Sequence, residues 1–199
     1  MDWTGNKHSI FTTLGASNHT DKERQAEDYY ATDPVAIDKL AKVFDIPEKV
    51  WECACGGGHL AKRLEELGHT VVATDLVYRG YGIGSIDFLM TQDEPNGSDC
   101  IITNPPYKIS TEFVEHGIRL MGDKPVIMLL KTTALEGKGR WERLYRNGWL
   151  HEVYQFKERL LCAKNGDFDS MIRGGGSAVA YAWYVFRGYP CEKTIIKWI

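Results

Sequence analysis

The sequence predicts a single α/β domain with a mostly parallel, doubly wound sheet and an antiparallel C-terminal strand. The first observation is the order of segments between residues 33 and 131, where short apolar runs alternate with amphipathic ones, as in successive βα units. The second is the change after residue 150, where strand-like runs are joined by a long polar loop. A chain of 199 residues is long enough for one such domain with a buried core.

Each element follows from a local pattern. A helix is expected over 33–44, because apolar residues recur at helical spacing behind Thr32 or Asp33 as an N-cap. A second helix is expected over 58–68, an amphipathic stretch that Gly68 ends. Apolar and β-branched runs predict strands over 49–54, 70–76, 85–89, 99–103, 125–131, 151–156 and 178–189, with helices between the fourth, fifth and sixth strands.

Composition limits the class of protein. Hydrophobic residues make up 43% and charged residues 26%, the balance of a globular protein, and no apolar run approaches the length of a membrane span. Residues 1–28 are polar and without periodicity, so they are expected to form an arm or lid beside a domain over 29–199. Five cysteines without a regular framework indicate reduced thiols in the cytoplasm, and no metal site is expected. The net charge of −3 does not indicate nucleic-acid binding, although a local basic patch would be sufficient for it.

A glycine-rich turn joins the first expected strand to the helix over 58–68. Gly56, Gly58 and Ala61 satisfy the spacing of a dinucleotide-binding turn, and Asp75 follows the next strand, where an acid that binds ribose belongs. Glu52, however, stands just before the glycines, where a carboxylate would repel a pyrophosphate and would suit a ligand with positive charge. A turn that binds nothing is the remaining interpretation.

Residues 104–107, Asn-Pro-Pro-Tyr, follow the strand expected over 99–103. The prolines fix φ and lack N–H groups, and the first of them drives Asn104 to an extended conformation. The Asn104 side-chain oxygen and the Pro105 carbonyl can then accept hydrogen bonds from the two hydrogens of a conjugated exocyclic amine. These bonds would favour the pyramidal nitrogen of the transition state. The aromatic ring of Tyr107 can stack on the planar group that carries the amine. The expected catalytic residues are Asn104, Pro105, Pro106 and Tyr107, and a plain surface loop is the alternative.

The order of these motifs resembles that of the S-adenosylmethionine-dependent DNA N6-adenine methyltransferases. The resemblance is carried by residues 29–34 (Tyr-Tyr-Ala-Thr-Asp-Pro), by the glycine turn with its two acids, and by Asn-Pro-Pro-Tyr. The whole chain further resembles small adenine methyltransferases encoded by phages and prophages. The resemblance implies a Rossmann-like methyltransferase fold, with S-adenosylmethionine as cofactor and S-adenosylhomocysteine as product. It also implies methyl transfer to N6 of adenine in DNA, with the base flipped out or single-stranded.

The resemblance also implies the contacts of the cofactor. Residues 32–34 would lie near the methionine carboxylate, Glu52 near its amino group, and Asp75 at both ribose hydroxyls. Residues 87–88 would contact the adenine ring. His59 is expected to pack or hydrogen-bond at the start of its helix and not to act as a base. The expected cofactor-binding set is Tyr30, Thr32, Asp33, Pro34, Glu52, Ala54, Cys55, Gly56, Gly58, His59, Leu60, Asp75, Leu76, Asp87, Phe88 and Asn104.

The substrate side is less clearly marked. No target-recognition domain is expected, because the sheet needs most of the residues after Tyr107. Either the enzyme reads little sequence, or its loops, a protein partner or a second copy of the chain read the DNA. The polar loop over 159–177 is either part of that surface or a loop without function. The basic stretch over 137–146 is either a solvated helix face or a contact to nucleic acid. The expected substrate contacts are Tyr107, Lys108, Lys131, Arg159, Lys164, Phe168 and Arg173.

Other functions stay open from the sequence. The same chemistry could act on RNA adenine, and less readily on protein glutamine, because Asn-Pro-Pro-Tyr reports a conjugated amine and not its carrier. An NAD(P)-dependent oxidoreductase is the competitor from a different class, because the glycine spacing fits one. A protein that binds the cofactor and masks DNA without activity is a third interpretation.

Overall fold

The computed structural model describes residues 29–164, 166–173 and 177–199. The arm or lid expected over residues 1–28 lies outside them. The strands are β1 (Tyr30–Thr32), β2 (Lys49–Glu52), β3 (Thr70–Ala73), β4 (Cys100–Thr103), β5 (Val126–Lys131), β6 (Leu150–Gln155), β7 (Cys162–Lys164), β8 (Tyr181–Phe186) and β9 (Ile195–Trp198). The α-helices are α3 (Val35–Ala41), α4 (His59–Glu66), α5 (Ser110–Met121), α6 (Lys138–Arg143) and α7 (Phe168–Arg173).

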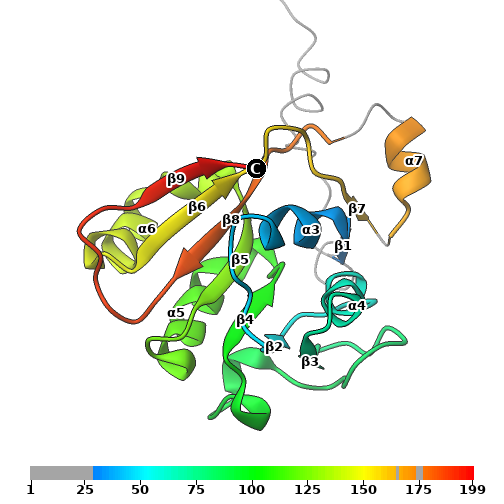
Figure 1. Cartoon of the computed structure of the whole chain (residues 1–199), viewed down its shortest axis with the longest axis horizontal. Helices are drawn as coiled ribbons and strands as arrows, with labels where there is room; N and C mark the ends of the chain where they lie inside the picture. Colours follow the sequence, from blue (N-terminus) through cyan, green and yellow to red (C-terminus); the bar gives the residue numbers. More distant parts are fainter. Residues whose placement is uncertain (1–28, 165, 174–176) are drawn as a thin grey trace, which may run out of the picture.

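The main sheet has seven strands in the order β3-β2-β4-β5-β8-β6-β9 (Figure 1). Pairing is parallel from β3 to β5 and between β6 and β9, whereas β8 runs antiparallel to both of its neighbours. This confirms the predicted α/β class and its antiparallel C-terminal strand. That strand lies inside the sheet, between β5 and β6. A separate two-stranded sheet pairs β1 with β7 antiparallel.

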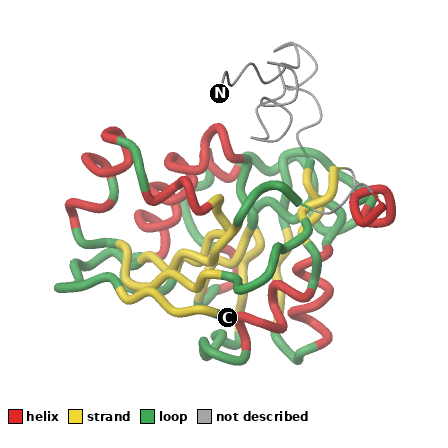
Figure 2. The backbone as a smooth tube through the Cα atoms, turned by 90° about the horizontal axis from the view of Figure 1, so that it is seen from above, coloured by secondary structure: helices red, strands yellow, loops and turns green. Residues whose placement is uncertain are grey.

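Helices cover both faces of the main sheet, as its doubly wound order requires (Figure 2). The side chains of β5 alternate between the two layers: Ile127 and Leu129 pack with α3 and α4, while Val126, Met128 and Leu130 pack with α5. In β8, all six residues are buried, and their side chains likewise alternate between the two layers. Because β4, β5 and β8 are buried on both faces, these strands are rich in apolar residues without polar alternation.

Several elements differ from the sequence prediction. Strand β1 was not predicted, and the loop expected over 159–177 contains β7 and α7. The segment 85–89 is not a strand, because the Asp87 carboxylate accepts the Leu89 N–H at 3.0 Å and starts a 3-10 turn over Phe88–Met90. Strand β9 was not predicted, since all four of its residues are exposed and show no alternation of apolar and polar side chains. None of the helices in the described residues combines the length and apolar character that crossing a bilayer demands.

The parallel strands end at one common edge of the sheet. Glu52 is the last residue of β2, Asp75 follows β3 by two residues, Asn104 directly follows β4, and Lys131 ends β5. Ligands of open α/β sheets bind at such an edge, where loops leave the carboxyl ends of the strands. The fold therefore brings together side chains that are up to 79 positions apart between β2 and β5.

Candidate active site

A cavity of about 220 Å³ opens at this edge. Thirteen of the residues expected to bind cofactor or to act in catalysis line it: Tyr30, Thr32, Glu52, Ala54, Cys55, His59, Leu60, Asp75, Leu76, Asn104, Pro105, Pro106 and Tyr107. Four further lining residues were not predicted, and these are Tyr29, Ala31, Val77 and Arg79. The residues on either side of the glycine turn, the acids and the Asn-Pro-Pro-Tyr segment thus form one site, whereas Gly56 and Gly58 themselves do not line the cavity.

The glycine turn is shaped by positive φ angles and by close aromatic neighbours. Gly56 has φ +53° and Gly58, the N-cap of α4, has φ +79°. A Cβ at Gly56 would clash with the Tyr29 ring, and one at Gly58 would clash with the Tyr81 ring. Glycine is therefore needed at both positions for its backbone freedom and for its lack of a side chain.

We expect Gly58→Ala to lower the free energy of unfolding by about 2–4 kcal/mol, from left-handed strain and overpacking against Tyr81 together. Gly68→Ala is the matched control, because Gly68 has φ +95° at the other end of α4 and nothing within 4 Å of its Cβ position. Its loss should be about 1–2 kcal/mol. Urea denaturation measures both, and equal losses would show that the Tyr81 contact costs nothing.

The Asp75 carboxylate is fixed by two backbone groups. The Gly56 N–H donates to Oδ2 at 2.8 Å, and the Val77 N–H donates to Oδ1 at 2.8 Å. Each carboxylate oxygen has a further lone pair, so both can still accept a hydrogen bond from a ligand. Two acceptors at a fixed spacing suit a vicinal diol.

Glu52 is a buried acid with an unsatisfied oxygen. It is 2% exposed, and Oε2 has no hydrogen-bond partner among the described residues. Burial raises the pKa of this carboxyl well above its usual value, repulsion by Asp75 adds to the rise, and the Ala61 backbone N–H opposes it. A ligand cation placed beside Glu52 would favour the ionised form and satisfy the free oxygen.

Asn104 holds its side-chain amide in one orientation. Nδ2 donates to the Thr32 hydroxyl at 2.9 Å, and Thr32 is only 3% exposed. Oδ1 is buried and has no hydrogen-bond partner among the described residues. Since Asn104 lines the cavity, this geometry leaves a desolvated acceptor at the site. Thr32, which is expected beside the cofactor, thus also contacts a residue that is expected to act in catalysis.

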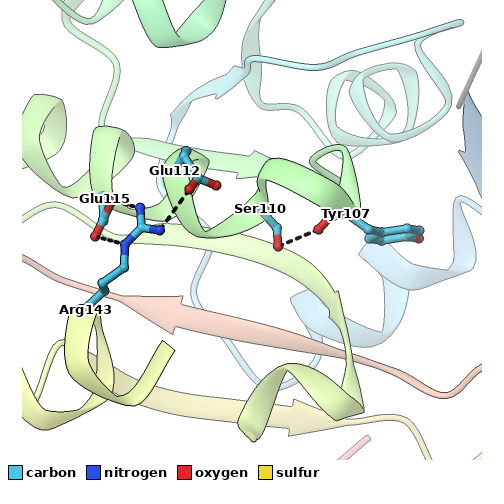
Figure 3. Close-up of polar contacts among 5 residues, drawn as sticks. All are labelled: Tyr107, Ser110, Glu112, Glu115 and Arg143. Carbon is cyan, nitrogen blue, oxygen red and sulfur yellow. Dashed lines mark hydrogen bonds and ion pairs between the residues drawn. The ribbon is translucent and has the colours of Figure 1, made fainter. Parts of the chain in front are cut away.

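Tyr107 is held in an aromatic cluster. Its ring stacks on Tyr181 with centroids 5.9 Å apart, lies 6.3 Å from the ring of Tyr30, and has Lys131 Nζ 4.7 Å from its centroid. Burial raises the pKa of its phenol well above the usual range, the neighbouring Cys162 and Tyr181 add to the rise, and the Asn104 side chain opposes it. Ser110 Oγ donates to the Tyr107 carbonyl at 3.1 Å and ties the loop to the start of α5 (Figure 3).

The basic stretch over 137–146 has a structural use. Arg143 on α6 forms ion pairs with Glu112 and Glu115 on α5, the first at 2.9 Å (Figure 3). The Arg140 guanidinium donates from Nε to the carbonyls of Ala134 and Glu136, both at 2.9 Å. These two cations are therefore engaged within the fold, which favours the interpretation of this stretch as a solvated helix face.

Several expected cofactor contacts lie away from the cavity lining. Asp33 accepts the Val35 N–H at 3.0 Å and supports the start of α3 beside Pro34. Asp87 caps its 3-10 turn. Phe88 is 2% exposed and packs in the core, with its ring 5.2 Å from Trp51 and 4.7 Å from Phe113. None of these side chains lines the cavity in this structure.

The expected substrate contacts fall into separate places. Lys131 joins the Tyr107 cluster, whereas Lys108 is exposed. Phe168 begins α7 and lies 5.8 Å from the His59 ring, and Arg173 donates to Ser170 at 3.2 Å on the same helix. Arg159 lines a second cavity. Lys164 ends β7, and its side chain lies outside what the structure describes.

Sequence reasoning missed three aromatic residues that shape the site. The Tyr29 hydroxyl accepts the Gly57 N–H at 2.9 Å and lies 3.1 Å from His59 Nδ1. His59 therefore makes a hydrogen bond at the start of α4, which is consistent with the structural role expected of it. Burial lowers the pKa of His59, so the imidazole is neutral at pH 7. Tyr81 packs over Gly58, and Tyr181 stacks on Tyr107. The double tyrosine at 29–30 was visible, but no local pattern marked the other two.

Comparison with solved structures identifies the fold. One match is a protein from Listeria monocytogenes assigned to the class I S-adenosylmethionine-dependent methyltransferases, with TM-score 0.59 and 13% identity over 97% of this chain and 72% of the other. A modification subunit of a type I restriction enzyme from Vibrio vulnificus matches with a TM-score of 0.58 and 15% identity, over 90% of this chain and 48% of the other. A Pyrococcus horikoshii protein assigned as an RNA methyltransferase matches with a TM-score of 0.54 and 15% identity, over 78% of this chain and 82% of the other.

These likenesses show that the chain has the fold of class I S-adenosylmethionine-dependent methyltransferases, as predicted. No protein-family model and no curated protein matches the chain. Activity, cofactor and substrate must therefore be argued from the site itself.

Proposed function

We propose that this protein binds S-adenosylmethionine in the cavity and transfers its methyl group to the N6 amine of adenine in DNA. The observation that carries the proposal is Asn104, which lines the cavity: its amide nitrogen donates to Thr32, and its buried oxygen has no hydrogen-bond partner among the described residues. A conjugated amine supplies the two hydrogens that such an acceptor and the Pro105 carbonyl require.

The cavity suits the charges and hydroxyls of this cofactor. Glu52 would hold the ammonium group of its amino-acid part, because the free Oε2 needs a donor with positive charge. Asp75 would accept from the two ribose hydroxyls. When bound, the cofactor supplies an electrophilic methyl group on a sulfonium.

The chain's own residues would orient the amine and stabilise the charge that develops on it. Asn104 Oδ1 and the Pro105 carbonyl would accept its two hydrogens, which favours the pyramidal nitrogen of the transition state. Tyr107 would stack on the adenine ring, with Lys131 moving from the ring face that it covers here. No general base is required, because the methylated, positively charged amine is acidic enough to lose a proton to water.

DNA is preferred to RNA in this proposal because residues 29–34 resemble the segment before the first strand of the DNA adenine methyltransferases, whereas residues 104–107 fit either polymer. A base inside a duplex cannot reach the cavity, so the target base would be flipped out or single-stranded. A protein partner or a second copy of the chain would contribute to target choice. The similar folds of a restriction modification subunit and of an RNA methyltransferase are compatible with either polymer.

Nucleoside mass spectrometry tests the proposal. The purified chain is incubated with S-adenosylmethionine and with unmethylated DNA or RNA in parallel. N6-methyladenine in DNA alone is the expected result. Methylated adenine in RNA alone would move the same chemistry to the other polymer, and no methylated nucleoside from either would contradict the proposal.

An NAD(P)-dependent oxidoreductase is the alternative from another class, and a titration separates the two. S-Adenosylhomocysteine is expected to bind and NADH is not, because the ammonium of the first can pair with an ionised Glu52, whereas the pyrophosphate of NADH repels the ionised form and gains no opposite charge from the protonated one. Tight binding of NADH would reverse this conclusion.

A further inference from the structure

A second cavity, of about 360 Å³, lies farther along the same edge of the sheet. Strands β6 and β9 are parallel and end side by side, with Gln155 opposite Trp198 (Figure 1). The antiparallel β8 begins at this edge with Tyr181, opposite Lys131 of β5. The lining residues are Gln155, Phe156, Lys157, Glu158, Arg159, Ala180, Tyr181 and Trp198.

Tyr181 connects the two cavities. It lines the second cavity and stacks on Tyr107, which lines the first. From β4, which Asn104 follows, to β9, which carries Trp198, the sheet order gives four strand steps, or roughly 19 Å at about 4.8 Å per step. About six nucleotides cover that distance at the roughly 3.4 Å rise per nucleotide of one strand of B-DNA. A polynucleotide with its target base at Asn104 can therefore reach the second cavity.

Trp198 offers a stacking surface there. Its side chain is 63% exposed, although large aromatic side chains are usually buried in a domain core. The backbone around it is fixed, because Ile199 N–H donates to Gln155 and Lys157 N–H donates to Ile199, both at 2.9 Å. Lys197 is engaged separately with Glu152 at 3.1 Å. An exposed indole on a fixed strand end is the kind of surface on which a nucleic-acid base stacks.

The charge around Trp198 suits a phosphate backbone. Lys157 and Arg159 are exposed, and neither forms an ion pair with any residue that the structure describes. Glu158 lies between them in the sequence, and its Oε2 is 3.4 Å from Lys39 Nζ of α3, so Lys39 offsets the charge of this carboxylate. The cavity rim therefore has, beside an aromatic ring, two cations that form no ion pair within the described part of the chain.

We propose that the second cavity binds a nucleotide that flanks the target adenine, with its base on Trp198 and its phosphate at Lys157 and Arg159. This site rests on the proposed function, since it extends the path of the same polynucleotide. It adds Trp198 and Lys157 to the substrate contacts and gives Arg159 a defined place.

Direct binding tests the site without turnover. A fluorescein-labelled single-stranded 12-mer with one central adenine is titrated with protein saturated with S-adenosylhomocysteine, and anisotropy is followed. Trp198→Ala is expected to weaken binding about 5- to 100-fold, the range that stacking of one base supports. Trp198→Phe should retain most of the affinity because it keeps a ring. Lys157→Ala with Arg159→Ala should reduce the slope of log affinity against log salt by about 1.4, at about 0.7 per phosphate contact.

Two controls distinguish loss of the stacking surface from a general effect of removing an indole or from damage to the fold. Trp141→Ala removes an indole that is 58% exposed on α6 and lines neither cavity, and it should leave oligonucleotide affinity unchanged. The Trp198→Ala protein should keep the thermal midpoint and the S-adenosylhomocysteine affinity of the parent.

The outcomes separate the two proposals. Parental affinity in Trp198→Ala, while the parent methylates DNA, would overturn the flanking site and leave the proposed function standing. If this surface binds a protein partner and not DNA, Trp198→Ala would likewise keep the parental affinity for the oligonucleotide, and the flanking site would be overturned. A parent that binds no oligonucleotide and forms no methylated nucleoside would overturn both. Equal weakening by Trp198→Phe and Trp198→Ala would exclude stacking.

Discussion

Asn104→Ala is expected to reduce kcat for adenine methylation by about 10²- to 10³-fold, the loss typical of removing one preorganised polar contact from a transition state. The substitution removes the acceptor that would grip the amine and leaves the Thr32 hydroxyl without its donor. The KM for the polynucleotide and the affinity for S-adenosylhomocysteine should change little, because Oδ1 is used mainly as charge develops on nitrogen. Steady-state kinetics with a radiolabelled methyl donor measures the effect.

Asn104→Asp is the informative companion. A carboxylate keeps an acceptor in place but cannot donate to Thr32, so the hydroxyl must turn and donate instead. More activity is therefore expected from the Asp variant than from the Ala variant. An Ala variant with parental kcat would remove Asn104 from the mechanism and with it the main support for the proposed function.

Glu52→Gln is expected to weaken S-adenosylhomocysteine binding by about 10- to 100-fold, as loss of one charge-assisted hydrogen bond would do. The free protein should be at least as stable as the parent at pH 7–8, because the variant no longer buries an acid beside Asp75. Calorimetric titration measures the first effect and urea denaturation the second. Loss of both affinity and stability would indicate a structural role for Glu52.

The pH dependence of binding follows from the direction of the Glu52 pKa. Without ligand, burial keeps this carboxyl protonated above the ordinary glutamate pKa of about 4.3. A ligand ammonium pairs with the ionised form, so affinity should rise as pH increases toward the raised pKa and level off above it. The stability of the free protein should fall over that same interval, because there the folded state binds the additional proton. Both trends should be absent from Glu52→Gln.

Methylthioadenosine provides the matched ligand control. It has the nucleoside part of the cofactor but lacks the amino-acid part, so it should bind the parent and Glu52→Gln equally well. Unequal binding would place the nucleoside, and not the ammonium, beside Glu52.

The location of the central site could be predicted from the sequence because the carboxyl ends of parallel strands always lie at the same edge of a sheet. Glu52, Asp75 and Asn104 each stand at or just beyond the end of an apolar run, and parallel pairing places those ends together. The spacing of the glycines likewise marked the turn before α4, where Gly56 and Gly58 have positive φ angles. Local sequence was sufficient wherever the fold repeats a regular unit.

The remaining features depend on contacts between distant segments. Tyr181 reaches Tyr107 only because β8 inserts between β5 and β6, and no local pattern specifies that position. The wrong strand at 85–89 has a different cause. There Asp87 competes for the backbone N–H groups, while Phe88 is buried by tertiary contacts with Trp51 and Phe113.

The small sheet of β1 and β7 has a consequence for the timing of site assembly. Its three residue pairs join positions about 130 apart in the chain, from Tyr30 with Lys164 to Thr32 with Cys162. Contacts of such high sequence separation form late, and a two-stranded ribbon has little stability of its own. Hydrogen exchange should therefore detect its opening below the free energy of global unfolding. Because this ribbon also positions Thr32 against Asn104, occupation of the cavity and closure of the ribbon are linked equilibria, and each must favour the other by the same factor.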